Sequence, residues 1–146
     1  MSKMFNRASS FNQPLENWNV SNVKNMSLMF AYASSFNQPL GKWNVSNVTT
    51  MYGMFSGASS FNQPLDKWDL SNTCTVVYMF YEAESFNHYP KSWIIPEGDE
   101  DPNFGSDPLG PLMPGSYGMF SGTKLADIFD KKPLKTHPVE SDSCHY

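Results

Sequence analysis

The densest group of side chains that could do chemistry is an acidic cluster in the second half of the chain. Glu97, Asp99, Glu100 and Asp101 supply clustered carboxylates, which are the ligands that Ca²⁺ prefers. A run of charges is also typical of a solvated loop. This run lies within residues 96–115, whose prolines and glycines prevent a regular element. The cluster therefore favours a solvated loop over a cation site.

Two further groups of side chains could bind metal ions. His137, Cys144 and His145 could bind zinc with one more ligand, but no paired Cys-x-x-Cys accompanies them. Methionines at helical spacing, such as Met26 and Met29, could form a copper stripe. Methionine beside phenylalanine is more typical of core packing. The sequence contains no nucleophile elbow, P-loop or dinucleotide fingerprint. We expect no enzyme, no metal site and no cofactor.

The composition further limits the classes of function that the chain could have. The chain has 146 residues, 40% hydrophobic content and 15% aromatic content, enough for the core of one domain. A net charge of −4 argues against general nucleic-acid binding, which needs a basic face. Cys74 and Cys144 are too few to define a disulfide framework. The sequence shows no signal peptide and no long apolar run, so we expect no direct membrane span.

The elements that position these side chains come from a 25-residue repeat. The regular copies are Met1–Asn25, Met26–Thr50 and Met51–Thr75. A unit of this length cannot bury its apolar face alone, so neighbouring units must stack. Identical residues should then form columns along the stack. The predicted columns are Phe11, Phe36, Phe61 and Phe86, and Trp18, Trp43, Trp68 and Trp93.

The pattern within one unit predicts its elements. Met26, Met29, Phe30 and Ala33 recur at the spacing of one face of a short helix. Residues 36–39 read as a loop, because proline fixes its own backbone angle and extends the residue before it. Residues 43–46 alternate between apolar and polar, as a half-buried strand does. The sequence therefore predicts an α/β repeat solenoid, a leucine-rich-repeat-like stack of about five coils, each with a short helix, a loop and a short strand.

The repeat also aligns asparagines. Asn12, Asn37, Asn62 and Asn87 form one column, and Asn22, Asn47 and Asn72 form another. Stacked amides that satisfy backbone groups between coils explain these columns better than a calcium or glycan site. Several asparagines also lie in N-x-S/T, the glycosylation motif. The Asn-Val-Ser-Asn pattern of the repeat produces that motif by itself, so we favour a structural role over glycosylation.

The motifs FNQPL, W-[ND]-[VL]-S-N and M-x-x-M-F resemble the BspA-like leucine-rich-repeat surface proteins, in the subfamily of 25-residue lipoprotein or mycoplasma-type repeats. The resemblance covers Met1 to about Ile95. It implies a non-catalytic surface for adhesion or protein binding, at the cell surface or secreted. It supplies no binding residues. The third unit departs from the pattern at Thr73, and the fourth departs more, at Pro96–Gly98.

Beyond residues 1–75, the organisation is less regular. We interpret residues 76–95 as a fourth, divergent coil, 96–115 as an acidic Pro/Gly insertion, 116–134 as a degenerate fifth coil and cap, and 135–146 as a polar tail. The insertion is the predicted specificity element, because insertions in repeat stacks map to one face. Its predicted partner-binding residues are Glu97, Asp99, Glu100, Asp101, Phe104, Leu109, Leu112 and Met113.

These observations predict a repeat scaffold for protein–protein interaction, of the surface or adhesion type. The alternative is a structural subunit docked in a large assembly, such as an organellar membrane complex or a virus particle, which would place the chain in an organelle or particle. Met1 is in register with Met26, so the first coil has no atypical capping sequence. Either a capping segment and a signal precede Met1 in the native protein, or the first coil stacks on a partner.

Overall fold

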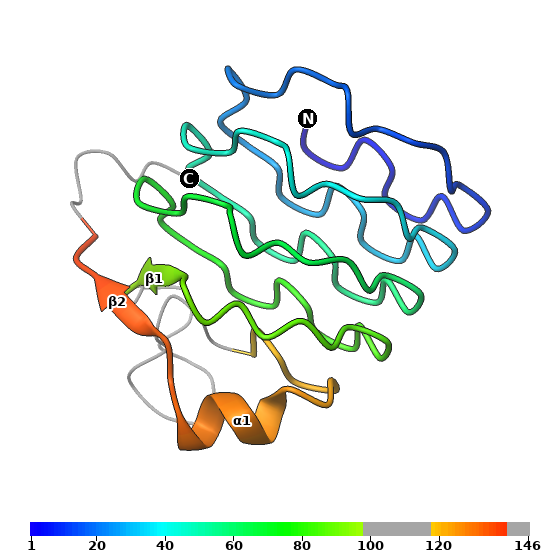
Figure 1. Ribbon diagram of the computed structural model, residues 1–146. Coiled ribbons are helices and arrows are strands. Elements are labelled where there is room, and N and C mark those ends of the chain that lie inside the picture. Colours follow the sequence, from blue (N-terminus) through cyan, green and yellow to red (C-terminus); the bar gives the residue numbers. More distant parts are fainter. Residues whose placement is uncertain (98–117, 140–146) are drawn as a thin grey trace, which may run out of the picture.

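The computed structural model describes residues 1–97 and 118–139. Its regular elements in these ranges are strand β1, Ile94–Pro96, helix α1, Ala126–Lys131, and strand β2, Lys135–His137. β1 and β2 pair in parallel, with Ile95 opposite Thr136. Figure 1 shows the rest of the described chain as loops laid side by side, from the first unit in blue to α1 at the opposite end. We call residues 1–25, 26–50, 51–75, 76–97 and 118–139 units 1 to 5.

The predicted α/β solenoid of five coils, each with a helix and a strand, is wrong. From residue 1 to residue 93 the described backbone consists of turns and irregular chain. Its ladder contacts there are two isolated parallel bridges, Asn25 to Thr50 and Thr50 to Thr75. The only regular elements of the described residues are the three short ones near the C-terminal end. The 25-residue units therefore lie next to one another without the helices and strands that the periodicity indicated.

The first eight residues of units 1 to 4, which we call the turn segment, explain why no helix forms. Their third and seventh residues have positive φ angles, for example 57° at Leu28 and 58° at Tyr32. Gly53 and Gly57 in unit 3 also have positive φ angles, of 57° and 68°. In unit 5 the described residues begin at the third position of this segment, so that Gly118 and Gly122 correspond to Gly53 and Gly57. A left-handed residue cannot continue a right-handed α-helix. Two such residues in eight convert the expected helix into consecutive turns.

The backbone hydrogen bonds follow from these turns. Alternate N–H groups donate to the next unit: Leu28 to the Tyr52 carbonyl at 2.8 Å, and Phe30 to the Met54 carbonyl at 2.9 Å. Intervening N–H groups donate within the unit, as Met29 does to the Met26 carbonyl at 3.3 Å. Because the turns repeat every four residues, they bury the same positions as a helix would. The apolar spacing was therefore compatible with both structures.

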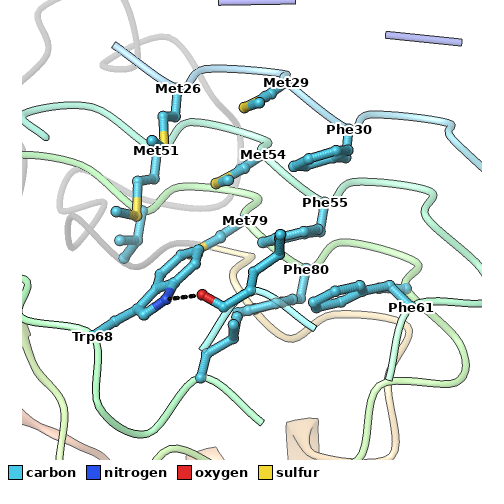
Figure 2. Packing of buried hydrophobic residues seen from close by; sticks show 14 of the residues in the cluster. Met26, Met29, Phe30, Met51, Met54, Phe55, Phe61, Trp68, Met79 and Phe80 are labelled. Atoms are coloured by element: carbon cyan, nitrogen blue, oxygen red, sulfur yellow. Dashed lines mark hydrogen bonds between the residues drawn. The ribbon is translucent and has the colours of Figure 1, made fainter. Parts of the chain in front are cut away.

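The core is formed by equivalent side chains of successive units. The ring centroids of Phe30 and Phe55 lie 5.5 Å apart, and those of Phe55 and Phe80 lie 5.4 Å apart. Figure 2 shows these three rings in order, with Met26 and Met51 aligned beside them. These five side chains are fully buried. Burying a side chain of this kind stabilises the fold by about 1.5–3 kcal/mol, so the stack is held mainly by its repeated core.

The two predicted aromatic columns lie along the same core. Ring centroids of consecutive members of the phenylalanine column are 5.9–6.0 Å apart. The Trp43 ring nitrogen donates to the Leu15 carbonyl of the preceding unit at 2.9 Å, and Trp68 donates in the same way to the Leu40 carbonyl. Figure 2 shows the bond of Trp68. Trp18, in unit 1, is 42% exposed, whereas Trp43 is 4% exposed.

The predicted ladder of asparagine amides is confirmed. The Asn37 N–H donates to the Asn12 side-chain oxygen at 2.9 Å, and the Asn62 N–H donates likewise to Asn37. In the second column, the Asn47 side chain donates to the Ser21 carbonyl at 2.7 Å. These amides supply partners to backbone groups that no strand ladder satisfies. Turns can therefore replace strands without leaving those groups unpaired.

Unit 5 covers the other end of the stack. The Phe120 ring stacks on Phe80 with centroids 5.7 Å apart, and Leu125 and Leu134 are also buried. α1 follows with Asp127 in its first turn and Lys131 in its last, which suits the dipole of a helix. No residue of α1 is buried. The stack therefore ends on this side in a helix that exposes Asp127, Asp130 and Lys131 and packs Phe129 against the core.

Candidate binding surface

The candidate site is a hollow that two glycines of unit 3 make possible. Gly53 and Gly57 occupy the third and seventh positions of the turn segment, where units 2 and 4 carry larger side chains. A Cβ atom on Gly53 would lie 2.7 Å from the Leu28 Cδ2 atom. One on Gly57 would lie 2.5 Å from the Tyr32 ring. The side chains of unit 2 therefore lie over the glycine backbone of unit 3, and no side chain can be added there without moving them.

Tyrosines form most of the wall of this hollow. Its volume is about 340 Å³. It is lined by Leu28, Tyr32, Tyr52, Gly53, Ser56, Tyr78 and Tyr81. The lining residues come from the turn segments of units 2, 3 and 4, so the hollow exists only where these three units are neighbours in this order. Tyr32 is 45% exposed, and the other three tyrosines are partly exposed.

The rings support one another edge to face. The Tyr52 and Tyr78 centroids are 5.9 Å apart with an interplanar angle of 84°, and those of Tyr78 and Tyr81 are 5.3 Å apart at 71°. Edge-to-face pairs of this kind contribute about 0.5–1.5 kcal/mol beyond burial. On the unit 1 side, the Arg7 guanidinium lies 5.1 Å from the centre of the Tyr32 ring. That contact is a cation–π interaction within the chain itself.

The groups with shifted pKa values do not line the hollow. The hydroxyl of Ser71, followed by its N–H at 2.9 Å, lowers the pKa of Asp69; burial opposes this effect, and the electrostatic interaction with His137 adds to it. Burial raises the pKa of Tyr89, whose hydroxyl donates to the Lys132 carbonyl. The Asp69 carboxylate and the Tyr89 hydroxyl each make a hydrogen bond that stabilises the backbone away from the hollow. The hollow therefore offers aromatic contact and hydroxyl groups rather than acid–base chemistry.

A second groove, of about 330 Å³, lies on the loop side of units 1 to 3. Charged residues of both signs line it, including Glu16, Lys42, Asp66 and Lys67. Three of these side chains are exposed and Glu16 is partly so. Interspersed exposed charges are typical of a solvated face. We therefore take the tyrosine hollow as the candidate site.

Most of the partner-binding residues predicted from the sequence lie outside the described residues. These are Asp99, Glu100, Asp101, Phe104, Leu109, Leu112 and Met113. Glu97 is described: it is exposed, and its N–H donates to the His137 carbonyl at 2.7 Å as an extension of the β1–β2 pair. His137 also contacts the Leu70 carbonyl at 3.0 Å through its ring nitrogen. Among the described residues, Glu97 therefore helps to hold the end of unit 4 against β2.

Sequence reasoning missed the tyrosines of the hollow. A signal was present, because glycine occupies the third and seventh positions only in units 3 and 5. In these units the larger side chain of the preceding unit packs over the glycine, as Tyr78 does over Gly118. A comparison of the positions at which the units differ, and not only of those at which they are identical, would have located the gap in the surface at unit 3.

Residues 1–97 and 118–139 contain neither a candidate metal site nor a candidate membrane span. No three histidine, cysteine, aspartate or glutamate side chains there come together in a way that could hold a metal ion. Among the same residues, no helix has the length and apolar character needed to cross a membrane.

Comparison with known proteins gave one match. The family described as Mycoplasma protein of unknown function, DUF285, matches residues 1–96. No curated protein and no solved structure matches the chain. The match supports the mycoplasma-type part of the resemblance seen in the sequence, and it does not confirm the BspA-like assignment. The matched range contains the whole tyrosine hollow.

Proposed function

We propose that this chain, which belongs to the Mycoplasma family of unknown function DUF285, is a non-catalytic module that binds other proteins at a cell surface. The observation that carries the proposal is the hollow of about 340 Å³ walled by four tyrosines. Tyrosine combines a large contact area with a polar hydroxyl, and it is enriched at protein interfaces. A hollow of this composition suits an anchoring side chain of a partner.

The preferred partner is a basic protein segment. Arg7, which does not line the hollow, lies against the Tyr32 ring, and this contact supports a guanidinium as the group that the partner presents. Cations are attracted to the faces of aromatic rings. The net charge of −4 would favour the approach of a positively charged partner. An arginine or lysine side chain inserted among Tyr32, Tyr52 and Tyr81 would combine both effects.

A surface location agrees with one further feature. Cys74 is disulfide-bonded. Disulfides persist in oxidising environments such as the cell exterior and are rare in reducing ones. The family match and this bond together favour the surface over an organelle interior.

The alternative function, a structural subunit docked in a larger assembly, has its own supporting observation. Unit 1 exposes apolar side chains that the other units bury, among them Met4 and Trp18. This face is distinct from the tyrosine hollow. The two functions can therefore be separated by changing one surface at a time.

The repeat itself supplies mild substitutions for a test. At the position of Tyr52, units 1 and 2 carry Ser2 and Ser27, and at the position of Tyr81, unit 3 carries Ser56. The double variant Tyr52→Ser/Tyr81→Ser should therefore fold while losing two walls of the hollow. The matched control is Glu84→Ser, at a position where units 1 to 3 carry serine.

The assay is affinity capture from the native source with the wild type, the double variant and the control, quantified by mass spectrometry. We expect proteins captured by the wild type and by Glu84→Ser to be lost with the double variant, while its circular dichroism is unchanged. Basic segments should be enriched among the cross-linked peptides. Equal capture by all three folded proteins would contradict the proposed role of the hollow.

A further inference from the structure

One hydroxyl lies deep in the tyrosine hollow. It belongs to Ser56, which lines the hollow and is only 7% exposed. The other buried polar side chains of the described chain, Thr73 and Thr75, are both bonded to the backbone. Thr73 Oγ1 donates to the Val48 carbonyl at 3.0 Å. Thr75 Oγ1 accepts the Val77 N–H at 3.2 Å. The Ser56 hydroxyl makes no such bond with the described residues.

The Ser56 oxygen is open to the hollow. In the part of the chain that the structure describes, every fully enclosed side-chain nitrogen or oxygen has a hydrogen-bond partner. The Ser56 oxygen has no partner there, so it is not fully enclosed, and the open space that this residue lines is the hollow. A hydroxyl oxygen can accept two hydrogen bonds. A donor group that enters the hollow would therefore find an unused acceptor.

The backbone holds Ser56 in place. Its N–H donates to the Gly53 carbonyl at 3.1 Å, and its carbonyl accepts the Tyr32 N–H at 2.7 Å. At the equivalent position, unit 2 carries Ala31, which is buried without a hydroxyl. The packing of the turn segment therefore does not need the hydroxyl of Ser56, and this group is free to serve binding.

The surroundings of this hydroxyl favour one kind of cation. None of the described residues that line the hollow carries a charge. A lysine ammonium is a compact, strongly hydrated charge, and lysine can bury its aliphatic stem while keeping that charge in water. An arginine guanidinium is planar, more weakly hydrated and stacks on aromatic faces. The Arg7 guanidinium lies over the Tyr32 ring, 5.1 Å from its centre. Arginine is therefore better suited than lysine to place its charged group inside the hollow.

Within the proposed function, on which this inference rests, we propose that Ser56 determines the specificity of the tyrosine hollow by selecting an arginine side chain of the partner over a lysine side chain. The guanidinium would lie against the tyrosine rings and donate one N–H from its edge to the Ser56 oxygen. Its remaining N–H groups would face the solvent at the opening. Lysine would lay its stem against the same rings and keep its ammonium in water, away from Ser56.

The test measures how tightly small peptides bind to the full chain. The probes are acetylated and amidated tripeptides with glycine on each side of arginine, lysine or citrulline, which keeps a planar head group without the charge. Dissociation constants come from NMR shifts of the tyrosine side chains during titration. Ser56→Ala gives unit 3 the residue that unit 2 carries, so it should fold. The matched control is Ser121→Ala, at the same position of unit 5 and outside the hollow lining.

We expect the wild type to bind the arginine peptide more tightly than the lysine and citrulline peptides. Ser56→Ala should weaken binding of the arginine peptide by about three- to tenfold, as the loss of one hydrogen bond does. The same variant should change binding of the lysine peptide by less than about twofold, because the ammonium stays in water. Ser121→Ala should match the wild type with every peptide.

Two results would overturn the role of Ser56 while leaving the hollow as a binding site. One is equal affinity of the wild type for the arginine and lysine peptides. The other is an unchanged preference for arginine in Ser56→Ala. Citrulline binding as tightly as arginine would overturn the selection of a cation. If no peptide shifts the tyrosine signals at millimolar concentration, the proposed function is contradicted together with the selectivity that rests on it.

Discussion

The sharpest consequence of the turn segment is the effect of adding one methyl group at Gly53. The apolar spacing of residues 51–58 matches a helix, and in a helix interior Gly→Ala stabilises a protein by about 0.5–1 kcal/mol. In the structure, Gly53 has a φ of 57°, and its N–H donates to the Val77 carbonyl of unit 4. The turn segment therefore predicts the opposite sign for Gly53→Ala.

The magnitude comes from three effects. Placing alanine in the left-handed region costs about 1–2 kcal/mol. Reduced freedom of the unfolded chain offsets about 0.4–1 kcal/mol of this. The new Cβ would also lie 2.7 Å from the Leu28 Cδ2 atom, but this is the end of a flexible side chain that can rotate away. We expect Gly53→Ala to reduce the free energy of unfolding by up to about 1.6 kcal/mol.

Urea unfolding followed by tryptophan fluorescence measures this effect. The double variant Leu28→Ala/Gly53→Ala removes the contact with Leu28 and leaves the backbone effect. Lys3→Gly is the reverse substitution at the equivalent position of unit 1, where φ is 59° and the side chain is exposed. It should leave stability unchanged or raise it. If Gly53→Ala stabilises the protein and Lys3→Gly destabilises it, the segment is helical and the reasoning from positive φ is refuted.

Two further predictions concern equivalent positions of different units. Trp43→Ala should reduce the free energy of unfolding by about 3–5 kcal/mol, because it removes a buried ring and its hydrogen bond to the Leu15 carbonyl. Trp18→Ala, at the equivalent exposed position of unit 1, should reduce the free energy of unfolding by less than half as much in the same urea titration. Equal losses would show that both rings are equally buried. Asp69 has a lowered pKa in the folded state, so its stabilising effect is present above the unfolded value of 3.8 and is lost as pH falls through the folded pKa. Asn is the residue that units 1 and 2 carry at this position. The variant Asp69→Asn should therefore lose less stability than the wild type as the pH falls below about 4, when urea midpoints are measured against pH; identical profiles would show that Asp69 contributes nothing.

The sequence predicted which residues lie inside better than it predicted the backbone that holds them. Met26, Met29, Phe30 and Ala33 are all fully buried, as a helical face would make them. Turns that repeat every four residues and a helix with 3.6 residues per turn cannot be distinguished over two turns. The difference lies in the φ angles of the third and seventh positions. Leucine and tyrosine occupy these positions in unit 2, and neither residue type signals a left-handed conformation.

The strand prediction was wrong for a related reason. Trp43 and Val45 are buried while Asn44 is exposed, so the alternation correctly indicated a half-buried segment. The Asn44 side chain, however, accepts the Ser46 N–H at 3.1 Å and forms a local turn. Asparagine side chains compete with strand ladders in this way. The backbone of this segment is consequently paired through turns and through the asparagine column, in which the Asn72 side chain donates to the Ser46 carbonyl at 2.8 Å, rather than through a sheet.

The separation of inward and outward positions also explains how a nearly identical core can carry a unique surface. In units 2 to 4 the first, fourth, fifth and eighth positions of the turn segment are buried and hardly vary, whereas the second, third, sixth and seventh positions do vary. An outward side chain packs over the next unit, as Tyr32 does over Gly57. The shape and chemistry of the surface at any point therefore depend on the outward residues of the two units that meet there. The hollow requires glycines in unit 3 and tyrosines in units 2 and 4 together, so exchanging the order of units 2 and 3 would preserve the core and eliminate the hollow.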